Sequence, residues 1–284
     1  MTLMKKFIVL PFFLLFIFCG CQSKKEQKPI TLPKIFESCK YIKKIDKNTL
    51  SEFEASGEVI LLKHFLQPHF IVFDVGANVG KWSQLVLSYE PSCKITAFEP
   101  VPEVFQKLKN NKILKKRKTS FHNYALSNES GKDIFYYYNK SNELSLLSSF
   151  YNRPSVNQDQ ATQPLKISIE KETLDHFCFV HKIPYIDFLK IDTEGAELAV
   201  LKGAKNLIEN HQITAIQFEY GKAFLDAHAS LEEIFSLLTK NDYLIFRMES
   251  NGLVFLPKWN PLLENYQFSN FFTIYRKKLP DFKK

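Results

Sequence analysis

The first residues of this chain that could do chemistry form a run in which an acid precedes two glycines. Asp74, Gly76 and Gly80 follow the apolar residues 70–73 in the order D-x-G-x-x-x-G. A short apolar run that ends in glycines predicts a buried parallel strand and a tight turn. Residues 81–89 then repeat apolar side chains at helical spacing. The unit is a strand, a glycine turn and a helix, which α/β proteins use to present backbone N–H groups to a cofactor.

A further acid lies where a cofactor with a ribose would need it. Glu99 follows the second strand-like segment, 94–98, and comes nineteen positions after Gly80. A carboxylate meets ribose hydroxyls at an offset of about 20 residues in nucleotide-binding α/β units. A carboxylate can accept hydrogen bonds from both hydroxyls. Asn78 stands where the dinucleotide motif G-x-G-x-x-G has a glycine, which counts against a nicotinamide-dependent oxidoreductase.

Three more acids accompany two later strand-like segments. Asp192 and Glu194 follow the segment 186–191, and Glu219 is near the end of the segment 214–220. The carboxyl ends of parallel strands form the crevice in which α/β proteins bind ligands, so we expect these side chains there. Asp192 is our first choice for a general base or an acceptor contact.

Other roles are open for these acids. Glu194 could be a helix N-terminal acid favoured by the helix dipole, and Glu219 could bind a backbone turn. The three acids could also hold a divalent cation. No histidine joins them at ligand spacing in the sequence, so we predict no metal.

The positioning elements alternate between strand-like and helix-like segments. This order predicts an α/β fold, with a mostly parallel twisted sheet and helices on both faces. Residues 120–127 predict a third strand with its exit loop, and residues 133–138 and 165–169 predict a pair of strands. The long polar segment between that pair, 139–164, is either a lid over the acceptor or a disordered loop.

Several stretches together resemble the FkbM family of S-adenosylmethionine-dependent methyltransferases. They lie within residues 70–276 and read F-D-V-G-A-N-V-G, F-E-P, T-L-D, L-K-I-D-T-E-G-A-E-L-A-V-L-K-G-A and Q-F-E-Y. The resemblance implies a Rossmann-like class I methyltransferase fold and S-adenosyl-L-methionine as the cofactor. It also implies O-methylation of a hydroxyl on a sugar or natural-product-like acceptor. The rival hypotheses are a membrane-tethered binding domain of this fold without catalysis and the oxidoreductase.

The resemblance also implies roles for single residues. Glu99 would hold the ribose, and Ala125 and Leu126 would lie near the adenine. Catalysis would fall to Asp192, Glu194 and Glu219. The residues that would cradle the methionine end of the cofactor are Asp74, Gly76, Ala77, Asn78 and Gly80.

The N-terminus resembles the signal of a bacterial lipoprotein. Lys5 and Lys6 precede the apolar residues 7–19, and Cys21 stands where a lipid would be attached. This divides the chain into a signal peptide (1–20), a tether (21–34), a helical extension (35–69) and a methyltransferase domain (70–284). Such a protein would be membrane-associated. However, the expected cofactor is made in the cytosol, so an uncleaved anchor on the cytoplasmic face of the inner membrane is the alternative.

Composition limits the partners of the protein. The formal net charge is +8, and the chain without residues 1–20, which hold two lysines and no acid, keeps +6. This mild excess does not indicate a nucleic-acid partner. The basic run 112–118 could touch a polyanion or an acidic membrane surface, or it could be a solvated helix end. The expected partners are a small-molecule or glycan acceptor and a membrane. Cys39, Cys93 and Cys178 are expected to be free thiols.

Overall fold

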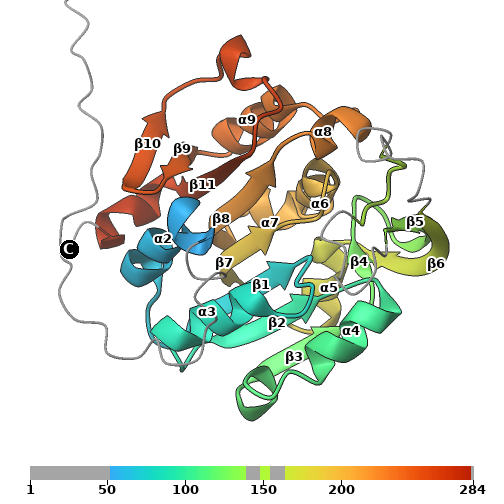
Figure 1. Ribbon diagram of the computed structural model, residues 1–284. Helices are drawn as coiled ribbons and strands as arrows, with labels where there is room; N and C mark the ends of the chain where they lie inside the picture. Colours follow the sequence, from blue (N-terminus) through green and yellow to red (C-terminus); the bar gives the residue numbers. More distant parts are fainter. Residues whose placement is uncertain (1–51, 139–147, 154–163, 283–284) are drawn as a thin grey trace, which may run out of the picture.

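A central sheet organises the part of the chain that the computed structural model describes, residues 52–138, 148–153 and 164–282 (Figure 1). Its strands are β1 Ile71–Val75, β2 Lys94–Phe98, β3 Thr119–His122, β7 Ile186–Ile191, β8 Ile213–Tyr220, β9 Tyr243–Glu249, β10 Gly252–Leu256 and β11 Ser269–Tyr275. They lie in the order β10-β9-β11-β8-β7-β1-β2-β3. Strands β8, β7, β1, β2 and β3 are parallel, and β11 is antiparallel to both of its neighbours. The prediction of a mostly parallel sheet is confirmed.

Helices cover both faces of this sheet (Figure 1). One face packs against α2 Glu58–Phe65, α3 Lys81–Tyr89 and α4 Pro102–Lys109. The other packs against α5 Leu174–Val180, α6 Glu197–Lys202, α7 Lys205–Glu209, α8 Ala223–Asp226 and α9 Leu231–Lys240. Short 3₁₀ helices are η1 Leu114–Lys116, η2 Pro261–Leu263 and η3 Arg276–Phe282.

The apolar pattern of the sequence explains these layers. Successive strand residues point to opposite faces, and Val72 and Phe73 of β1 are both fully buried because both faces are covered. The helical spacing expected over residues 81–89 is found in α3, whose residues Trp82 and Leu85 are buried against the sheet. Local pattern and tertiary packing therefore agree in the centre of the fold.

Three polar residues interrupt the apolar face under α2 and α3. Asp74 of β1 is in register with Lys190 of β7, which is in register with Gln217 of β8. All three side chains are buried. Gln217 Nε2 donates a hydrogen bond of 2.6 Å to Glu58 Oε1 of α2. Because Asp74 and Lys190 are near the carboxyl ends of their strands, this polar row reaches the edge where α/β proteins bind ligands.

A smaller sheet contains β4 Ala125–Leu126, β6 Leu165–Glu172 and β5 Gly131–Tyr137, in that order. Strands β5 and β6 are antiparallel, which confirms the predicted pair. The third strand expected within residues 120–127 is found as β3, but the part expected to be its exit loop contains β4, which belongs to the smaller sheet. Asn123 lies between them and donates from Nδ2 to the carbonyls of Glu99 and Pro100. Its side chain thus fixes a bend where a continuous strand would need a straight backbone.

The N-terminal predictions fall largely outside the described residues. The signal peptide, the tether and Cys21 lie there, and the helical extension is described only from residue 52, where it includes α2. Within the described ranges, no helix combines the length and the apolar character that crossing a bilayer requires. Cys93 and Cys178 are buried free thiols, as expected, and Cys39 lies outside the described ranges.

Candidate cofactor and acceptor site

The glycine turn after β1 approaches β7 too closely for any side chain. Gly76 has φ 82°, in the left-handed region that favours glycine. A Cβ atom built on Gly76 would overlap the backbone carbonyl oxygen of Asp192. Glycine is therefore required here by the contact between two loops of the protein itself. A clash with the cofactor is not needed to explain it.

The N–H groups of this turn are bonded within the protein. Gly76 N and Ala77 N both donate to Phe98 O, at 3.1 and 2.9 Å, and Gly80 N donates to Ala77 O at 2.8 Å. Asn78 N donates to Glu99 Oε2 at 3.0 Å, and Val79 N donates to Asn78 Oδ1. The expectation that the turn presents free N–H groups to a cofactor is therefore wrong. Side chains, carbonyl groups and the first residues of α3, Lys81 and Trp82, are left to supply the contacts.

Asp74 offers such a side chain. It is fully buried, and its Oδ2 accepts a hydrogen bond of 2.6 Å from Ser83 Oγ of α3. Its Oδ1 is buried and has no hydrogen-bond partner among the described residues, although Asp74 lines the cavity of the site. Burial raises the pKa of Asp74, and the nearby Lys190 opposes this shift. A buried acceptor without a partner fits a cofactor that brings an ammonium group, as the methionine end of S-adenosylmethionine does.

Glu99 holds the turn in place as well as facing the cavity. Its Oε2 accepts the N–H of Asn78, and its Oε1 accepts the N–H of Val101 at 2.9 Å. Burial raises the pKa of Glu99 to about 7, against the opposing effect of these two hydrogen bonds. Each carboxylate oxygen keeps a second lone pair for a ribose hydroxyl. The residue thus combines bracing of the loop with the predicted ribose contact.

We expect Glu99→Gln to weaken both folding and cofactor binding. The new amide group would face one of the two backbone N–H donors, leaving a buried donor without an acceptor, which costs about 1–3 kcal/mol. Urea unfolding measures the first effect and calorimetry with S-adenosylmethionine the second. Glu103→Gln on α4 is a matched control, since Glu103 is exposed, makes a surface ion pair with Lys107 and accepts a long hydrogen bond of 3.5 Å from the hydroxyl of Tyr137, which an amide oxygen can still accept. If Glu99→Gln unfolded at the same urea concentration as the parent protein, the role of Glu99 in bracing the turn would be contradicted.

The cavity beside the turn brings the predicted residues together. Its volume is about 700 Å³, which is within the range of small-molecule sites. The predicted residues that line it are Asp74, Gly76, Ala77, Asn78, Glu99, Ala125, Leu126, Asp192, Glu194 and Glu219. Gly80 does not line it; this residue is the N-cap of α3, and a Cβ there would press on the side chains of Leu108 and Leu114. Phe135 and Phe150, in edge-to-face contact, add an apolar wall near Ala125 and Leu126, which suits an adenine ring.

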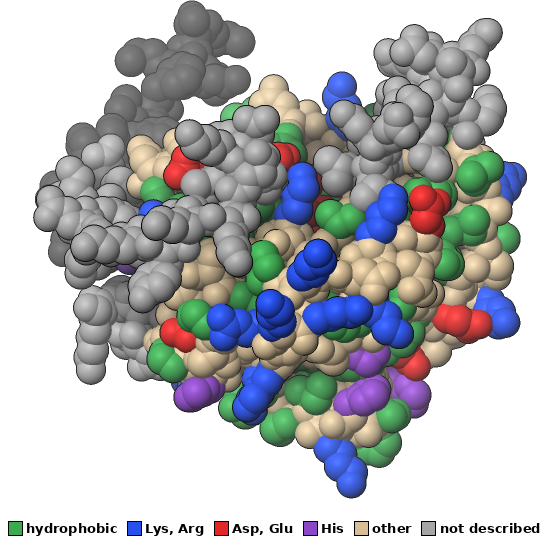
Figure 2. All heavy atoms as spheres, turned by 60° about the horizontal axis from the view of Figure 1, so that its bottom comes forward, with side chains coloured by type: hydrophobic (Ala, Val, Ile, Leu, Met, Phe, Trp, Pro, Cys, Tyr) green, Lys and Arg blue, Asp and Glu red, His purple; other side chains and the backbone are tan. Residues whose placement is uncertain are grey.

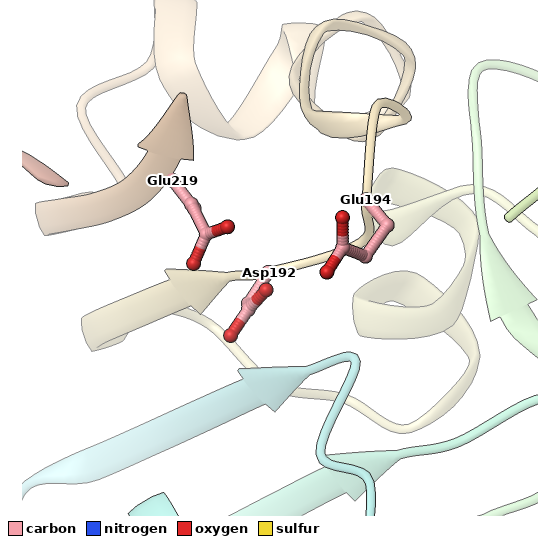
Figure 3. A group of neighbouring side chains, drawn as sticks. All are labelled: Asp192, Glu194 and Glu219. Atoms are coloured by element: carbon pink, nitrogen blue, oxygen red, sulfur yellow. The ribbon is translucent and has the colours of Figure 1, made fainter. Parts of the chain in front are cut away.

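The three acids meet in the lining of this cavity. Asp192 and Glu194 lie in the loop that follows β7, and Glu219 is the penultimate residue of β8. Figure 3 shows the carboxylates turned toward one another, and one oxygen of each lies within 4.8 Å of the others. Burial and then the charge of Asp192 raise the pKa of Glu194 to about 8. Burial, Asp192 and Glu194 raise the pKa of Glu219 well above its usual range.

Two cations that our sequence reasoning missed balance part of this charge. Lys190 Nζ donates to Asp192 Oδ2 at 2.7 Å, and Arg153 Nη1 donates to Glu194 Oε2 at 2.6 Å. Burial disfavours the charged form of Lys190, but Asp192, Asp74 and Glu58 outweigh it and raise its pKa, so Lys190 stays protonated. A charged residue next to the last position of a mainly apolar strand was a signal for Lys190. Arg153 lies within the polar segment, where one more polar residue gives no signal. The expectation of no metal here stays a prediction.

Part of the long polar segment lies against the acids. Residues 148–153 are described, and Ser149 pairs with Tyr136 of β5 through two backbone hydrogen bonds of 2.8 and 3.1 Å. Ser149 Oγ also donates to the carbonyl oxygen of Glu194 at 2.7 Å. This part of the segment therefore covers the acidic end of the site. The rest of the segment falls outside the described ranges.

Other residues of the long motif support the site from behind. Glu197 is buried and accepts hydrogen bonds from Thr193 N, Thr193 Oγ1 and Gly195 N. Glu197, at the start of α6, therefore takes the helix N-terminal role that the sequence left open for Glu194. No hydrogen bond joins Glu219 to a backbone turn within the described residues, so that alternative role has no support.

Residues 74–245 match the Methyltransferase FkbM domain family. The 2-O-methyltransferase NoeI of Sinorhizobium fredii is 26% identical, with 50% of this chain and 60% of NoeI covered. The hexuronic acid methyltransferase AglP of Haloferax volcanii is 25% identical, with 64% of this chain and 72% of AglP covered. The plantazolicin methyltransferase BpumL, solved with S-adenosylhomocysteine, has a TM-score of 0.43 and 11% identity, with 80% of this chain and 84% of BpumL covered.

The family match settles the family and leaves the acceptor open. The chain spans only about 60% of the length of several curated relatives, 59% in one case and 60% in two others. The family match covers 74–245, which is more than half of the chain and includes both the glycine turn and the three acids. S-adenosyl-L-methionine is the cofactor of this family, and the chain belongs to the FkbM methyltransferases.

Proposed function

We propose that the protein transfers a methyl group from S-adenosyl-L-methionine to a hydroxyl group of a sugar or of a sugar-like small molecule. The observation that carries this proposal is the position of Asp192, at the edge of the cavity that Asp74, Gly76 and Glu99 also line. A relative named as a 2-O-methyltransferase and another named as a hexuronic acid methyltransferase support the hydroxyl and the sugar.

Asp192 can act as the general base of this reaction. When bound, the cofactor supplies an electrophilic methyl group on a sulfonium. Lys190 holds Oδ2 of Asp192, which fixes the carboxylate and leaves Oδ1 to accept the proton of the acceptor hydroxyl. Because the pKa of Glu219 is raised, its carboxyl group holds a proton more readily and can donate a hydrogen bond to a second hydroxyl. Alignment of the two reactants supplies much of the acceleration.

The walls at the acidic end suit an acceptor that carries several hydroxyl groups. Phe53, just before α2, and Phe268, just before β11, line the same cavity as the acids. Phe268 is 64% exposed, so its ring is available for contact. Aromatic rings can pack against the apolar face of a sugar while carboxyl groups bind its hydroxyls.

The N-terminal sequence supports membrane attachment as a second part of this proposal. Residues 7–19 are apolar and follow Lys5 and Lys6. Either lipidation at Cys21 or an uncleaved segment would attach the enzyme to a membrane. The rival function, a tethered binding domain without catalysis, rests on the same segment.

Donor binding and methyl transfer test the proposal in two steps. The full chain, purified in neutral detergent, is expected to bind S-adenosylmethionine in calorimetry. It is then expected to transfer a labelled methyl group to neutral glycosides or to hexuronic acid glycosides, with matched O-methylated glycosides as controls. Donor binding without turnover on any hydroxyl acceptor would favour the binding domain. Absence of donor binding would overturn the assignment of the cavity.

A further inference from the structure

The surface formed by the end of α4, η1 and the start of β3 carries a dense group of cations. We call it the basic surface; it consists of Lys107, Lys109, Lys112, Lys115, Lys116, Arg117 and Lys118, all of which are exposed. Figure 2 shows the face that contains these elements, with Lys and Arg side chains spread across it and few acids among them.

The charge of this surface has little compensation. Residues 104–128, all described, contain no aspartate or glutamate. In the described residues, Lys107 pairs with Glu103 at 3.6 Å, and Lys115 donates to Asn110. The basic surface therefore carries more positive charge per area than it would if the net charge of +8 were spread evenly over the protein. Such a field attracts an anionic partner.

The location of the basic surface separates it from the active site. Arg117 and Lys118 directly precede β3, and Lys118 O accepts a hydrogen bond from Ile95 N near the start of β2. Arg117 and Lys118 thus lie at the amino ends of the parallel strands, whereas Asn111, in the same stretch of chain, donates from Nδ2 to Val79 O of the turn after β1. The turn after β1 and the acids lie at the carboxyl ends of these strands. None of the seven cations lines the cavity, so a partner bound to the basic surface would leave the cavity accessible.

The composition of the surface favours a lipid partner over a nucleic acid. Residues 106–120 contain no aromatic side chain, whereas proteins that bind single-stranded nucleic acids commonly stack bases on aromatic rings. A cluster of lysines and arginines near a membrane anchor is typical of binding to anionic phospholipids. In the proposed function, on which this inference rests, the apolar N-terminal segment with its two lysines is that anchor.

We propose that the basic surface docks on anionic phospholipid headgroups of the membrane to which the N-terminal segment attaches the protein. The geometry permits this. The 30 residues from 22 to 51 can span at most about 100 Å, and Glu52, where the described chain begins, lines the cavity at the opposite edge of the sheet. The docked enzyme presents the cavity away from the lipid, toward acceptors in solution.

Hydrogen exchange of the full chain in lipid nanodiscs tests this docking. The anchor is identical in discs of phosphatidylcholine alone and in discs with added phosphatidylglycerol, so only the surface charge of the lipid differs. We expect peptides from residues 104–120 to exchange more slowly in the anionic discs, with the effect removed by high salt. Peptides from β8 serve as the internal reference.

Charge variants separate specific docking from a general effect of net charge. The test variant replaces four lysines of the basic surface, Lys112, Lys115, Lys116 and Lys118, with glutamine. The control variant replaces four exposed lysines elsewhere, Lys182, Lys222, Lys240 and Lys258, and has the same net charge. Each lost cation should weaken docking about fivefold, so the test variant should lose the protection and the control variant should keep most of it.

Three outcomes would overturn the proposal. Equal exchange of residues 104–120 in neutral and anionic discs would show that the basic surface does not contact the lipid. Equal loss of protection in both variants would show that the protection depends on net charge and not on the basic surface. Protection by an oligoribonucleotide in neutral discs, without protection by anionic lipid, would assign the surface to nucleic acid.

Discussion

Asp192→Asn is expected to lower kcat for methyl transfer by about 100- to 10,000-fold, the range for loss of a general base, while donor binding is retained. Asparagine keeps the shape of the side chain and can still accept a hydrogen bond from Lys190, but its amide cannot take up a proton at neutral pH. The donor contacts of Asp74 and Glu99 are untouched by this change. Initial rates with a labelled methyl donor, together with calorimetry, measure the two effects.

The neighbouring acids provide the discriminating controls. Asp242→Asn makes the same chemical change at an exposed aspartate, whose side chain pairs among the described residues only with Arg276 at 3.8 Å, and should leave the rate unchanged. Glu194→Gln and Glu219→Gln should reduce the rate less than Asp192→Asn, because these carboxyl groups have raised pKa values and position the acceptor. If Glu194 were the base, the rate of the parent would rise with pH through about 8, and Glu194→Gln would abolish that rise. A larger loss in Glu219→Gln than in Asp192→Asn would transfer the role of base to Glu219.

The fold followed from the sequence where local pattern and packing carry the same information. The apolar strands and amphipathic helices around the sheet were expected from spacing alone, and α3 occupies residues 81–89 as predicted. The family and the fold class are confirmed by the match over residues 74–245 and by the parallel sheet. The bend at Asn123 was missed because it depends on hydrogen bonds to Glu99 and Pro100, more than twenty positions away along the chain.

The sequence was sufficient to predict which acids meet in the site, but it was not sufficient to predict the residues that pair with them. Acids at the ends of neighbouring strands converge by topology, so Asp192, Glu194 and Glu219 could be placed together. The pairing of Glu194 with Arg153 depends on how a long loop folds back, which no local pattern encodes. Likewise, the spacing of the glycine turn did not show that its N–H groups are bonded within the protein. The sequence indicated that position 76 matters, but it did not show why a glycine is needed there, which is the close approach of the loop after β7.

Gly76→Ala is expected to destabilise the protein by about 2–5 kcal/mol and to abolish donor binding. The left-handed backbone costs an alanine about 1–2 kcal/mol, and overlap in a packed interior costs about 1–3 kcal/mol more. The overlap is with the carbonyl oxygen of Asp192, so the turn and the loop after β7 must move apart. That movement displaces Asp192 from the cavity. Urea unfolding and calorimetry with S-adenosylmethionine follow the two consequences.

Gly131→Ala separates the two causes of this destabilisation. Gly131 also has a positive φ, 145°, but a Cβ atom built there meets no atom within 4 Å. This φ is at least as unfavourable for alanine as the φ of Gly76, so a larger cost at Gly76 must come from the overlap. Gly131 is in β5, outside the cavity lining, and its variant should bind the donor like the parent. If Gly76→Ala unfolds at the same urea concentration as Gly131→Ala, the contact between the two loops does not constrain the site. If Gly76→Ala also binds the donor normally, the turn after β1 is not part of the cofactor site.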